Sequence, residues 1–283
     1  MAAVLALLSS LAWGTSDFLG GLAARRVGSI RVLAVSYPAG AVLITFLALV
    51  IIPGQWSWST VTIGIVAGVV GALAIGLLYA ALSRGQMGIV SPITAVLSGA
   101  VPVGVGVVLG ESLPILALVG VAVAGVAVVL VSRESGPHRR TPIRAVVLAA
   151  ASGLAIGVYL SVIGTAPDDS GIWVATMGRW FSTIVVVAIL AILIYRSRSA
   201  PPANRPSFPW NLAIAAGVLD ALANAVFQLA AQRGLLAIVA VIGSLYPAAT
   251  VILARVFLKE TLSRTQVLGV TLALLAAATL TLA

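Results

Sequence analysis

Long apolar runs dominate this sequence and leave little room for anything else. A helix needs roughly 20 apolar residues to cross the hydrocarbon core of a bilayer, which is about 30 Å thick. Runs of that length follow one another along almost the whole chain, separated by short polar links. We therefore predict ten membrane-spanning helices, at residues 2–24, 31–52, 60–83, 89–109, 113–132, 143–166, 172–195, 212–232, 236–258 and 264–282.

The composition agrees with a membrane protein made only of helices. Hydrophobic residues make up 61% of the chain and charged residues 8%, whereas soluble domains carry about 25% charged residues. The runs are also too long and too uniformly apolar for the strands of a membrane barrel, which alternate at every second residue. We predict an all-α integral membrane protein that lies in the lipid bilayer.

Several kinds of chemistry are missing from the sequence. The chain has no cysteine, and its single histidine, His138, stands beside two arginines in a predicted link. We therefore predict no metal site and no cofactor. A phosphate-binding P-loop and a Gly-x-Ser-x-Gly nucleophile motif are also absent, so we predict that the protein is not an enzyme. The net charge of +9 is explained by basic links at a membrane surface, and we predict no nucleic-acid binding.

The sequence repeats itself at one fixed offset. Residues 67–69, 84–85 and 111–113 reappear, identical or nearly so, at 216–218, 233–234 and 260–262, and the differences 216−67, 233−84 and 260−111 all equal 149. A weaker match joins the starts of the two halves, where residues 9–14 resemble residues 152–157. We predict a first five-helix repeat at 1–132, a connecting loop at 133–142 and a second five-helix repeat at 143–283.

An odd number of crossings in each repeat has a topological consequence. The second repeat then enters the membrane from the opposite side, so the two repeats are inverted with respect to each other. Inverted repeats around a central cavity are typical of transporters that work by alternating access. The alternative is that duplication only enlarged a helical bundle with another role, such as a membrane-embedded enzyme or a lipid-handling protein.

The charges of the predicted links are distributed unequally between the two membrane faces. Nearly all Lys and Arg residues of the links, Arg139 among them, fall on the face reached after the first crossing. Arg233, Glu111, Asp168 and Asp169 fall on the other face. Because basic loops stay in the cytoplasm, we predict a multi-pass protein of the cytoplasmic membrane with the 133–142 loop inside and both termini outside.

Several short motifs recur at corresponding places along the chain. They are Ala12-Trp13-Gly14 in the first predicted helix, Pro247 and Phe257-Leu258-Lys259-Glu260 around the ninth, Gly269 in the tenth, and Gly110-Glu111 and Gly120 in the first half. In these residues the pattern resembles the ten-helix, EamA-type branch of the drug/metabolite transporter superfamily along the whole chain. The resemblance implies a cavity at the centre of the bundle and transport of small metabolites such as amino acids.

The chain departs from that pattern in its first half. Family members often carry an arginine in the second helix of a repeat. Arg179 fits this role in the second half, but the first half has Tyr37-Pro38 instead. Pro102 also stands one turn after the position equivalent to Pro247, which Ser98 occupies. The gate and the site of the first half are therefore expected to differ from those of relatives.

Three ionisable residues fall inside predicted spans, where a charge costs several kcal/mol and therefore suggests a function. Asp17 is predicted to accept a proton or to bind a substrate ammonium, and the alternative is a static ion pair with Arg179. Asp220, Asn224 and Gln228 are spaced four residues apart and therefore share one helix face. We expect this face to line a water-filled cavity. The alternative is that the three side chains only join helices by hydrogen bonds.

Arg179 also has two possible roles. It either grips a substrate carboxylate or phosphate with its planar guanidinium, or it neutralises Asp17 or Asp220. Aromatic residues at similar depth are candidates for the pocket wall, although core packing also explains them: Trp13, Tyr37, Tyr79, Tyr159 and Tyr246. Prolines within predicted helices are hinge candidates: Pro38, Pro92, Pro102 and Pro247.

These observations together predict a secondary transporter. We expect it to move small polar metabolites, with amino-acid export the leading candidate, and protons are the candidate coupling ion because no ATP-binding motif is present. The alternative is a membrane-embedded lipid-handling protein or enzyme without transport activity.

Overall fold

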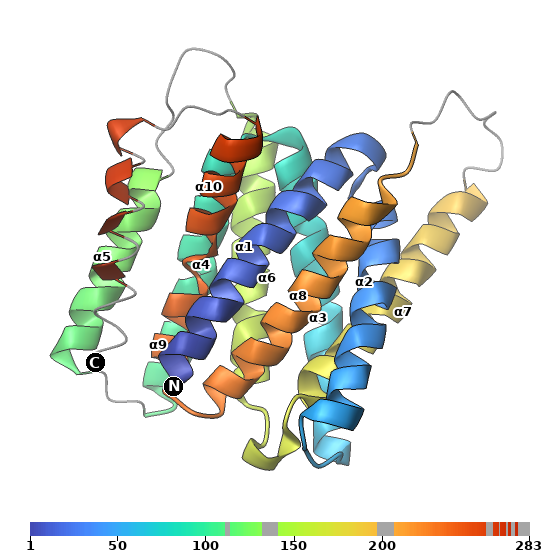
Figure 1. Cartoon of the computed structure of the whole chain (residues 1–283), viewed down its shortest axis with the longest axis horizontal. Helices are drawn as coiled ribbons and strands as arrows, with labels where there is room; N and C mark the ends of the chain where they lie inside the picture. Colours follow the sequence, from blue (N-terminus) through green and yellow to red (C-terminus); the bar gives the residue numbers. More distant parts are fainter. Residues whose placement is uncertain are drawn as a thin grey trace.

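The computed structural model describes residues 1–110, 114–131, 141–196 and 207–258, and near the C-terminus residues 263–265, 267–269, 271–272 and 275–276. Within these ranges the chain forms helices and no strands (Figure 1). The helices are α1 (Ala2–Val27), α2 (Ser29–Phe46), which continues as the π-helix η1 (Leu47–Ile51), α3 (Trp58–Arg84), α4 (Met87–Val108), α5 (Ile115–Val131), α6 (Ile143–Gly164), the short 3-10 turn η2 (Asp168–Ser170), α7 (Trp173–Arg196), α8 (Trp210–Ala231), α9 (Leu236–Gly243) and α10 (Tyr246–Leu258).

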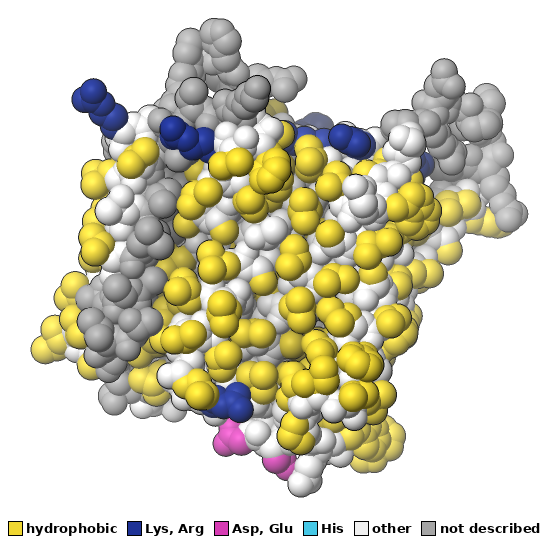
Figure 2. Space-filling view, in the orientation of Figure 1, with side chains coloured by type: hydrophobic (Ala, Val, Ile, Leu, Met, Phe, Trp, Pro, Cys, Tyr) yellow, Lys and Arg dark blue, Asp and Glu magenta, His cyan; other side chains and the backbone are white. Residues whose placement is uncertain are grey.

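Eight helical stretches in the described part of the chain are long and apolar enough to cross a membrane. They are α1, α2 with η1, α3, α4, α6, α7, α8, and α9 with α10. Helix α5 is shorter, at 17 residues. The predicted last span, 264–282, falls mostly outside the described residues. Apolar side chains cover the outer surface between the two ends of the bundle (Figure 2), as expected where the solvent is hydrocarbon. The chain is thus a multi-pass, all-α membrane protein.

Charged side chains lie at the two ends of the bundle, and the ends differ in sign. Arginines occupy the last turns of α1, α3 and α7, which all finish at the same end. The opposite end carries Asp168 and Asp169 in η2 and Arg233 after α8. Figure 2 shows Lys and Arg along the upper rim, and acidic side chains beside a basic one at the lower end.

The predicted ninth helix, 236–258, is interrupted in the structure. Helix α9 ends at Gly243, α10 begins at Tyr246, and Ser244 and Leu245 form a turn between them. Proline at the second position of α10 has no N–H to donate to the preceding turn, so Pro247 fits the start of a helix better than its interior. The prediction of one continuous helix is wrong here. Pro38, by contrast, lies within an unbroken α2, and Pro92 and Pro102 lie within α4.

The helices pack in matched pairs. Helix α1 packs along α8, and α6 packs along α3. The Ser9 hydroxyl donates to the Ala223 carbonyl across the first contact, and the Ser152 hydroxyl donates to the Ala74 carbonyl across the second, each at 2.8 Å. These four residues are separated by the two offsets found in the sequence, since 152−9 is 143 and 223−74 is 149. The same hydrogen bond is therefore made twice by corresponding residues.

Small residues allow two other helix pairs, α2 with α8 and α3 with α7, to approach closely. A Cβ atom on Gly217 of α8 would overlap the Ser36 carbonyl of α2, and a Cβ on Gly68 of α3 would stand 2.7 Å from the Gly178 carbonyl of α7. Close contacts between small residues are the usual basis of helix association in lipid, where apolar surfaces gain nothing from leaving water.

Candidate functional site

The bundle encloses a cavity between the two halves of the chain. Its volume is about 40 Å³. Helices α1, α2, α3, α6, α7 and α8 and the α9–α10 junction contribute to its wall. The polar or aromatic lining residues are Trp13, Asp17, Tyr37, Tyr159, Arg179, Ser182, Asp220, Asn224, Ser244 and Tyr246, and the apolar ones are Gly71, Ala74, Ile75, Leu78, Ile156, Leu160, Gly178 and Gly243.

An ion pair between Arg179 and Asp220 crosses one side of this cavity. The Arg179 Nη2 atom donates to the Asp220 Oδ2 atom, and both residues are buried, with 6% and 5% of their surfaces exposed. The guanidinium also stands 4.7 Å above the centre of the Tyr37 ring, a cation–π contact. The charge of Arg179 is thus already balanced by a carboxylate and held against an aromatic face.

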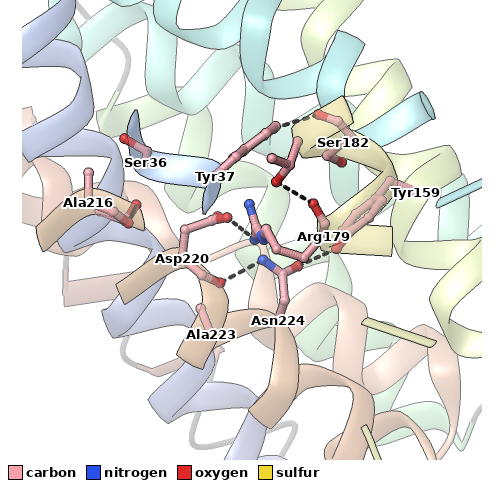
Figure 3. Close-up of polar contacts among 12 residues, drawn as sticks. Ser36, Tyr37, Tyr159, Arg179, Ser182, Ala216, Asp220, Ala223 and Asn224 are labelled. Atoms are coloured by element: carbon pink, nitrogen blue, oxygen red, sulfur yellow. Dashed lines mark hydrogen bonds and ion pairs between the residues drawn. The ribbon is translucent and has the colours of Figure 1, made fainter. Parts of the chain in front are cut away.

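Hydrogen bonds fix the surroundings of this pair (Figure 3). The Asn224 side chain donates to the Asp220 backbone carbonyl at 2.6 Å and accepts from the Tyr159 hydroxyl at 2.7 Å. The Tyr37 hydroxyl donates to the Gly71 carbonyl at 3.2 Å. Buried polar networks in which the members are satisfied hold a single geometry, so this side of the cavity is rigid.

Asp17 has a different environment. Only 4% of its surface is exposed, yet none of the described residues forms an ion pair or a hydrogen bond with its carboxylate. The sequence left open whether Asp17 pairs with Arg179, and the structure shows that Arg179 pairs with Asp220 instead. A buried charge without a partner is costly, so this carboxylate is the group in the cavity with the most to gain from a ligand.

Tyr246 lies close to Asp17 in the lining. Its hydroxyl is buried, and in the described part of the chain it makes no hydrogen bond of ordinary geometry, although the Ser98 side chain lies near it. Gly14 of α1 allows this arrangement, because a Cβ there would overlap the Tyr246 carbonyl. The Thr250 hydroxyl further ties α10 to α1 by donating to the Gly14 carbonyl at 2.9 Å. The α9–α10 interruption thus brings the Tyr246 hydroxyl to the wall that carries Asp17.

Two of the predicted site residues do not line the cavity. The Gln228 side chain accepts from the Ala175 backbone N–H at 2.8 Å and donates to the Ser170 hydroxyl at 3.2 Å, so it holds the start of α7 and the preceding turn. Tyr79 packs against α1 at Gly20, where a Cβ would overlap its ring. Helical spacing placed Gln228 on the correct face but could not show where along its length the cavity ends.

The lining also contains polar residues that the sequence interpretation did not select. Ser182 stands three residues after Arg179, a spacing that places both on one helix face, and its hydroxyl donates to the Gly68 carbonyl at 2.7 Å. The spacing could have identified it. Ser244 lies in the interruption between α9 and α10, and no local signal indicated that this turn would face the cavity.

Known proteins place this architecture in a family. A model of the EamA-like transporter family matches two stretches of the chain, residues 1–133 and 143–282. No curated protein matches. A solved structure titled only "Crystal structure of protein" is similar with a TM-score of 0.74 over 99% of this chain and 98% of that one, at 19% identity, a likeness that shows the fold alone.

These comparisons confirm the resemblance found in the sequence, because the family match extends over both halves and nearly to both ends of the chain. The general role of a membrane transporter follows from it. The chain belongs to the EamA-like transporter family.

Proposed function

We propose that the protein is a secondary transporter that exports small polar metabolites, amino acids first among them, across the cytoplasmic membrane by alternating access. The observation that carries this proposal is the pairing pattern in the cavity. One carboxylate, Asp17, is unpaired and available to a ligand, while the other, Asp220, is held by Arg179. A cavity at the centre of an apolar bundle, with one carboxylate that has no ion-pair partner among the described residues, suits reversible binding of a polar solute.

The proposed architecture is ten helices in two inverted five-helix repeats, 1–132 and 143–283, joined by the 133–142 loop. Corresponding lining positions support it. Asp17 and Leu160 are 143 residues apart, and Gly71 and Asp220 are 149 apart, which are the two offsets of the repeat. Both members of each pair lie on the cavity wall. The paired serine hydrogen bonds of α1–α8 and α6–α3 agree with the same relation. Exchange of conformation between such repeats is the basis of alternating access.

The proposed orientation puts the basic rim and the 133–142 loop in the cytoplasm and both termini outside. The supporting observation is that arginines end α1, α3 and α7 at one face of the bundle, together with the preference of basic loops for the cytoplasm.

Protons are the proposed coupling ion, and Asp17 is the proposed carrier. A carboxylate that is protonated when the substrate leaves and ionised when it binds links the two movements. The other ionisable groups on the cavity wall are the Arg179–Asp220 pair and the three tyrosines Tyr37, Tyr159 and Tyr246. Of all these lining groups, Asp17 is the one carboxylate without a counter-ion among the described residues.

The α9–α10 interruption is the proposed hinge of the second half. Pro247 is the second residue of α10, just after the Ser244–Leu245 turn, and Ser244 and Tyr246 line the cavity. Pro38, Pro92 and Pro102 remain hinge candidates within helices that are continuous in this conformation.

Reconstitution into liposomes tests the function directly. Proteoliposomes loaded with a panel of labelled amino acids and amino-acid derivatives are expected to release at least one of them faster than protein-free liposomes, and an inward proton gradient is expected to accelerate release. Asp17→Asn should abolish the response to the gradient. Release that is independent of the protein for every compound would contradict the transport proposal, and an unchanged gradient response in Asp17→Asn would contradict the coupling proposal.

A further inference from the structure

We propose that the link between α6 and α7, residues 167–172, is a plug in the transport path. The path leaves the cavity along one face of α8, toward the end of the bundle that carries η2. When the plug moves aside, Gln228 and Gln232 become part of the lining of this path. The inference rests on the proposed function, since a transporter that alternates access needs a route from its central site to each membrane face.

A polar stripe on α8 indicates the route. Asp220, Asn224, Gln228 and Gln232 follow one another at spacings of four, which places them on one face of the helix. The first two line the cavity, and the last two lie about one and two turns closer to the η2 end. Gln228 is 0% exposed, so the stripe faces the interior of the bundle and not the lipid. A polar track thus runs from the cavity toward the η2 end.

The plug covers the part of this track that lies beyond the cavity. The Gln232 Nε2 atom faces three acceptors of the plug, the Pro167 and Gly171 carbonyls at 3.0 Å and the Ser170 hydroxyl at 3.1 Å. The Gln228 Nε2 atom donates to the same hydroxyl at 3.2 Å. Ser170, the shared partner, is 0% exposed. The two glutamines therefore seat the plug over the track.

The other side of the plug meets the first half of the chain. The Gln55 backbone N–H donates to the Asp169 carbonyl at 2.8 Å, and the Trp173 indole N–H donates to the Gly54 carbonyl at 3.2 Å. A Cβ on Gly54 would stand 2.6 Å from the Ser170 carbonyl, so glycine permits this close approach. The contact joins the α2–α3 link to the α6–α7 link at the lower end of the bundle (Figure 1). It has to break if the two halves separate at this end.

The bonds that seat the plug join neutral groups. Their donors are side-chain amides, an indole and a backbone N–H, and Asp169 takes part through its backbone carbonyl. A hydrogen bond between neutral groups is readily exchanged for one with water, whereas separating a buried ion pair such as Arg179–Asp220 is far more costly. The α2–α3 link also follows the π-helix η1, a form that often marks functional segments. The plug is therefore the contact better suited to open and close.

The corresponding link at the opposite end is not seated in this way by the described residues. Gly28 and Gly171 are 143 residues apart and both have a positive φ, 84° and 55°. A Cβ on Gly171 would stand 2.7 Å from the Pro53 carbonyl, whereas a Cβ on Gly28 would meet no described atom within 4 Å. Ser83 corresponds to Gln232 at the offset of 149, and its hydroxyl donates to its own helix. Such a difference between the two ends is what alternating access requires.

Solvent access to the plug tests the inference without a substrate. The chain has no cysteine, so Ile172→Cys, at a position that is 0% exposed, gives a single reporter. In nanodiscs, which leave both faces of the protein accessible, a water-soluble maleimide is expected to label it slowly. Adding Gln232→Ala or Gln232→Glu should raise the labelling rate at least fivefold, because each removes the amide donor that seats the plug. An unchanged rate in both variants would overturn the inference.

Two controls separate movement of the plug from general loosening. Arg233→Gln should leave the rate unchanged, because the Arg233 side chain donates to a carbonyl of its own helix. A second reporter, Leu33→Cys, is also 0% exposed but lies on α2. Its labelling should stay slow when Gln232→Ala is added. Equal acceleration at both reporters would show that the whole bundle had loosened and would overturn the inference.

A reversible cross-link tests the effect on transport. Gln55 and Asp169 are exposed and are joined by a backbone hydrogen bond. The double variant Gln55→Cys/Asp169→Cys should form a disulfide under oxidant, which lowers the flux of labelled amino acids in proteoliposomes at least tenfold, and the flux should return under reductant. The cysteine-free wild type with the same oxidant is the control.

The outcomes of the cross-link distinguish the plug from the transport proposal. Full flux through the cross-linked protein, or failure to form the cross-link, would overturn the plug and leave the transport proposal standing. Absence of flux for every labelled amino acid before oxidation would count against the transport proposal, and the labelling of Ile172→Cys would then decide on the plug alone.

Discussion

The two walls of the cavity share a scaffold and differ in chemistry. On one wall, α1 and α8 are joined by the Ser9–Ala223 hydrogen bond and carry Asp17 and Asp220. On the other, α6 and α3 are joined by the corresponding Ser152–Ala74 bond, and the matching positions are Leu160 and Gly71. The backbone contacts are kept in both pairs, while the two carboxylates occur in one. Packing between small residues therefore constrains the scaffold, and the chemistry of the lining varies independently of it.

The two carboxylates of the polar wall differ in turn. Asp220 is neutralised by Arg179 within a hydrogen-bonded network, and Asp17 has no counter-ion among the described residues. Removing the partner of a satisfied charge and removing an unsatisfied charge have opposite consequences for stability. This difference separates a residue that holds the site together from one that is free to bind. The first two predictions below test it, and the other two test the comparison of the two walls.

The largest effect is expected from Arg179→Leu. It leaves Asp220 buried without a partner and should lower the free energy of unfolding by about 3–5 kcal/mol. The measurement is denaturant unfolding in mixed micelles. The double variant Arg179→Leu/Asp220→Leu removes both charges and should recover most of the loss. A single variant as stable as the wild type would show that the ion pair is not structural.

Asp17→Asn should affect transport without destabilising the fold. The gradient-driven flux of the transported compound is expected to fall at least tenfold. The free energy of unfolding should stay the same or rise, because a costly buried charge is removed. Proteoliposome flux and micelle unfolding are measured on the same preparation. A loss of stability like that of Arg179→Leu would mean that Asp17 has a structural partner after all.

A smaller effect, on ligand affinity, is expected from replacing the aromatic side chain of Trp13 on the polar wall. The matched control is the aliphatic Ile156 on the other wall. Trp13→Leu should weaken binding of the transported amino compound about fivefold, since a cation–π contact with its ammonium group contributes about 1 kcal/mol or more. Ile156 is the position corresponding to Trp13, at an offset of 143. Ile156→Leu should change the affinity by less than twofold. Titration calorimetry measures both, and equal losses would remove the aromatic contribution from the model of ligand recognition.

The smallest effects are expected at the shared scaffold. Ser9→Ala and Ser152→Ala each remove one buried hydroxyl donor to a backbone carbonyl and should cost about 1 kcal/mol. The two values should agree within about 0.5 kcal/mol, and the double variant should show their sum, because the two hydroxyls bind different carbonyls in different helix pairs and share no partner. Unfolding in mixed micelles provides the comparison. A large cost at one serine only would argue that the two contacts are not equivalent.

The sequence by itself determined the solvent and the class of this protein. Apolar runs of spanning length require lipid around them, because no other arrangement satisfies their backbone groups and their side chains together. The repeat and the Gly and Glu positions were sufficient to indicate the family, and the family match over residues 1–133 and 143–282 confirms it. The presence of Asp17, Arg179 and Asp220 within spans was likewise visible, since a charge in an apolar run is conspicuous.

Only the tertiary structure decided which of these charges meet. Asp17, Arg179 and Asp220 lie on three helices, and their pairing depends on how α1, α7 and α8 are rotated and shifted against one another. The spacing of residues along one helix carries no information on that. Two further features depend on the same packing. The break between α9 and α10 brings Ser244 and Tyr246 to the cavity. The Gln228 side chain is hydrogen-bonded at the start of α7 and therefore lies outside the cavity. Periodicity determines the face on which a side chain lies, and contacts between helices determine its partner.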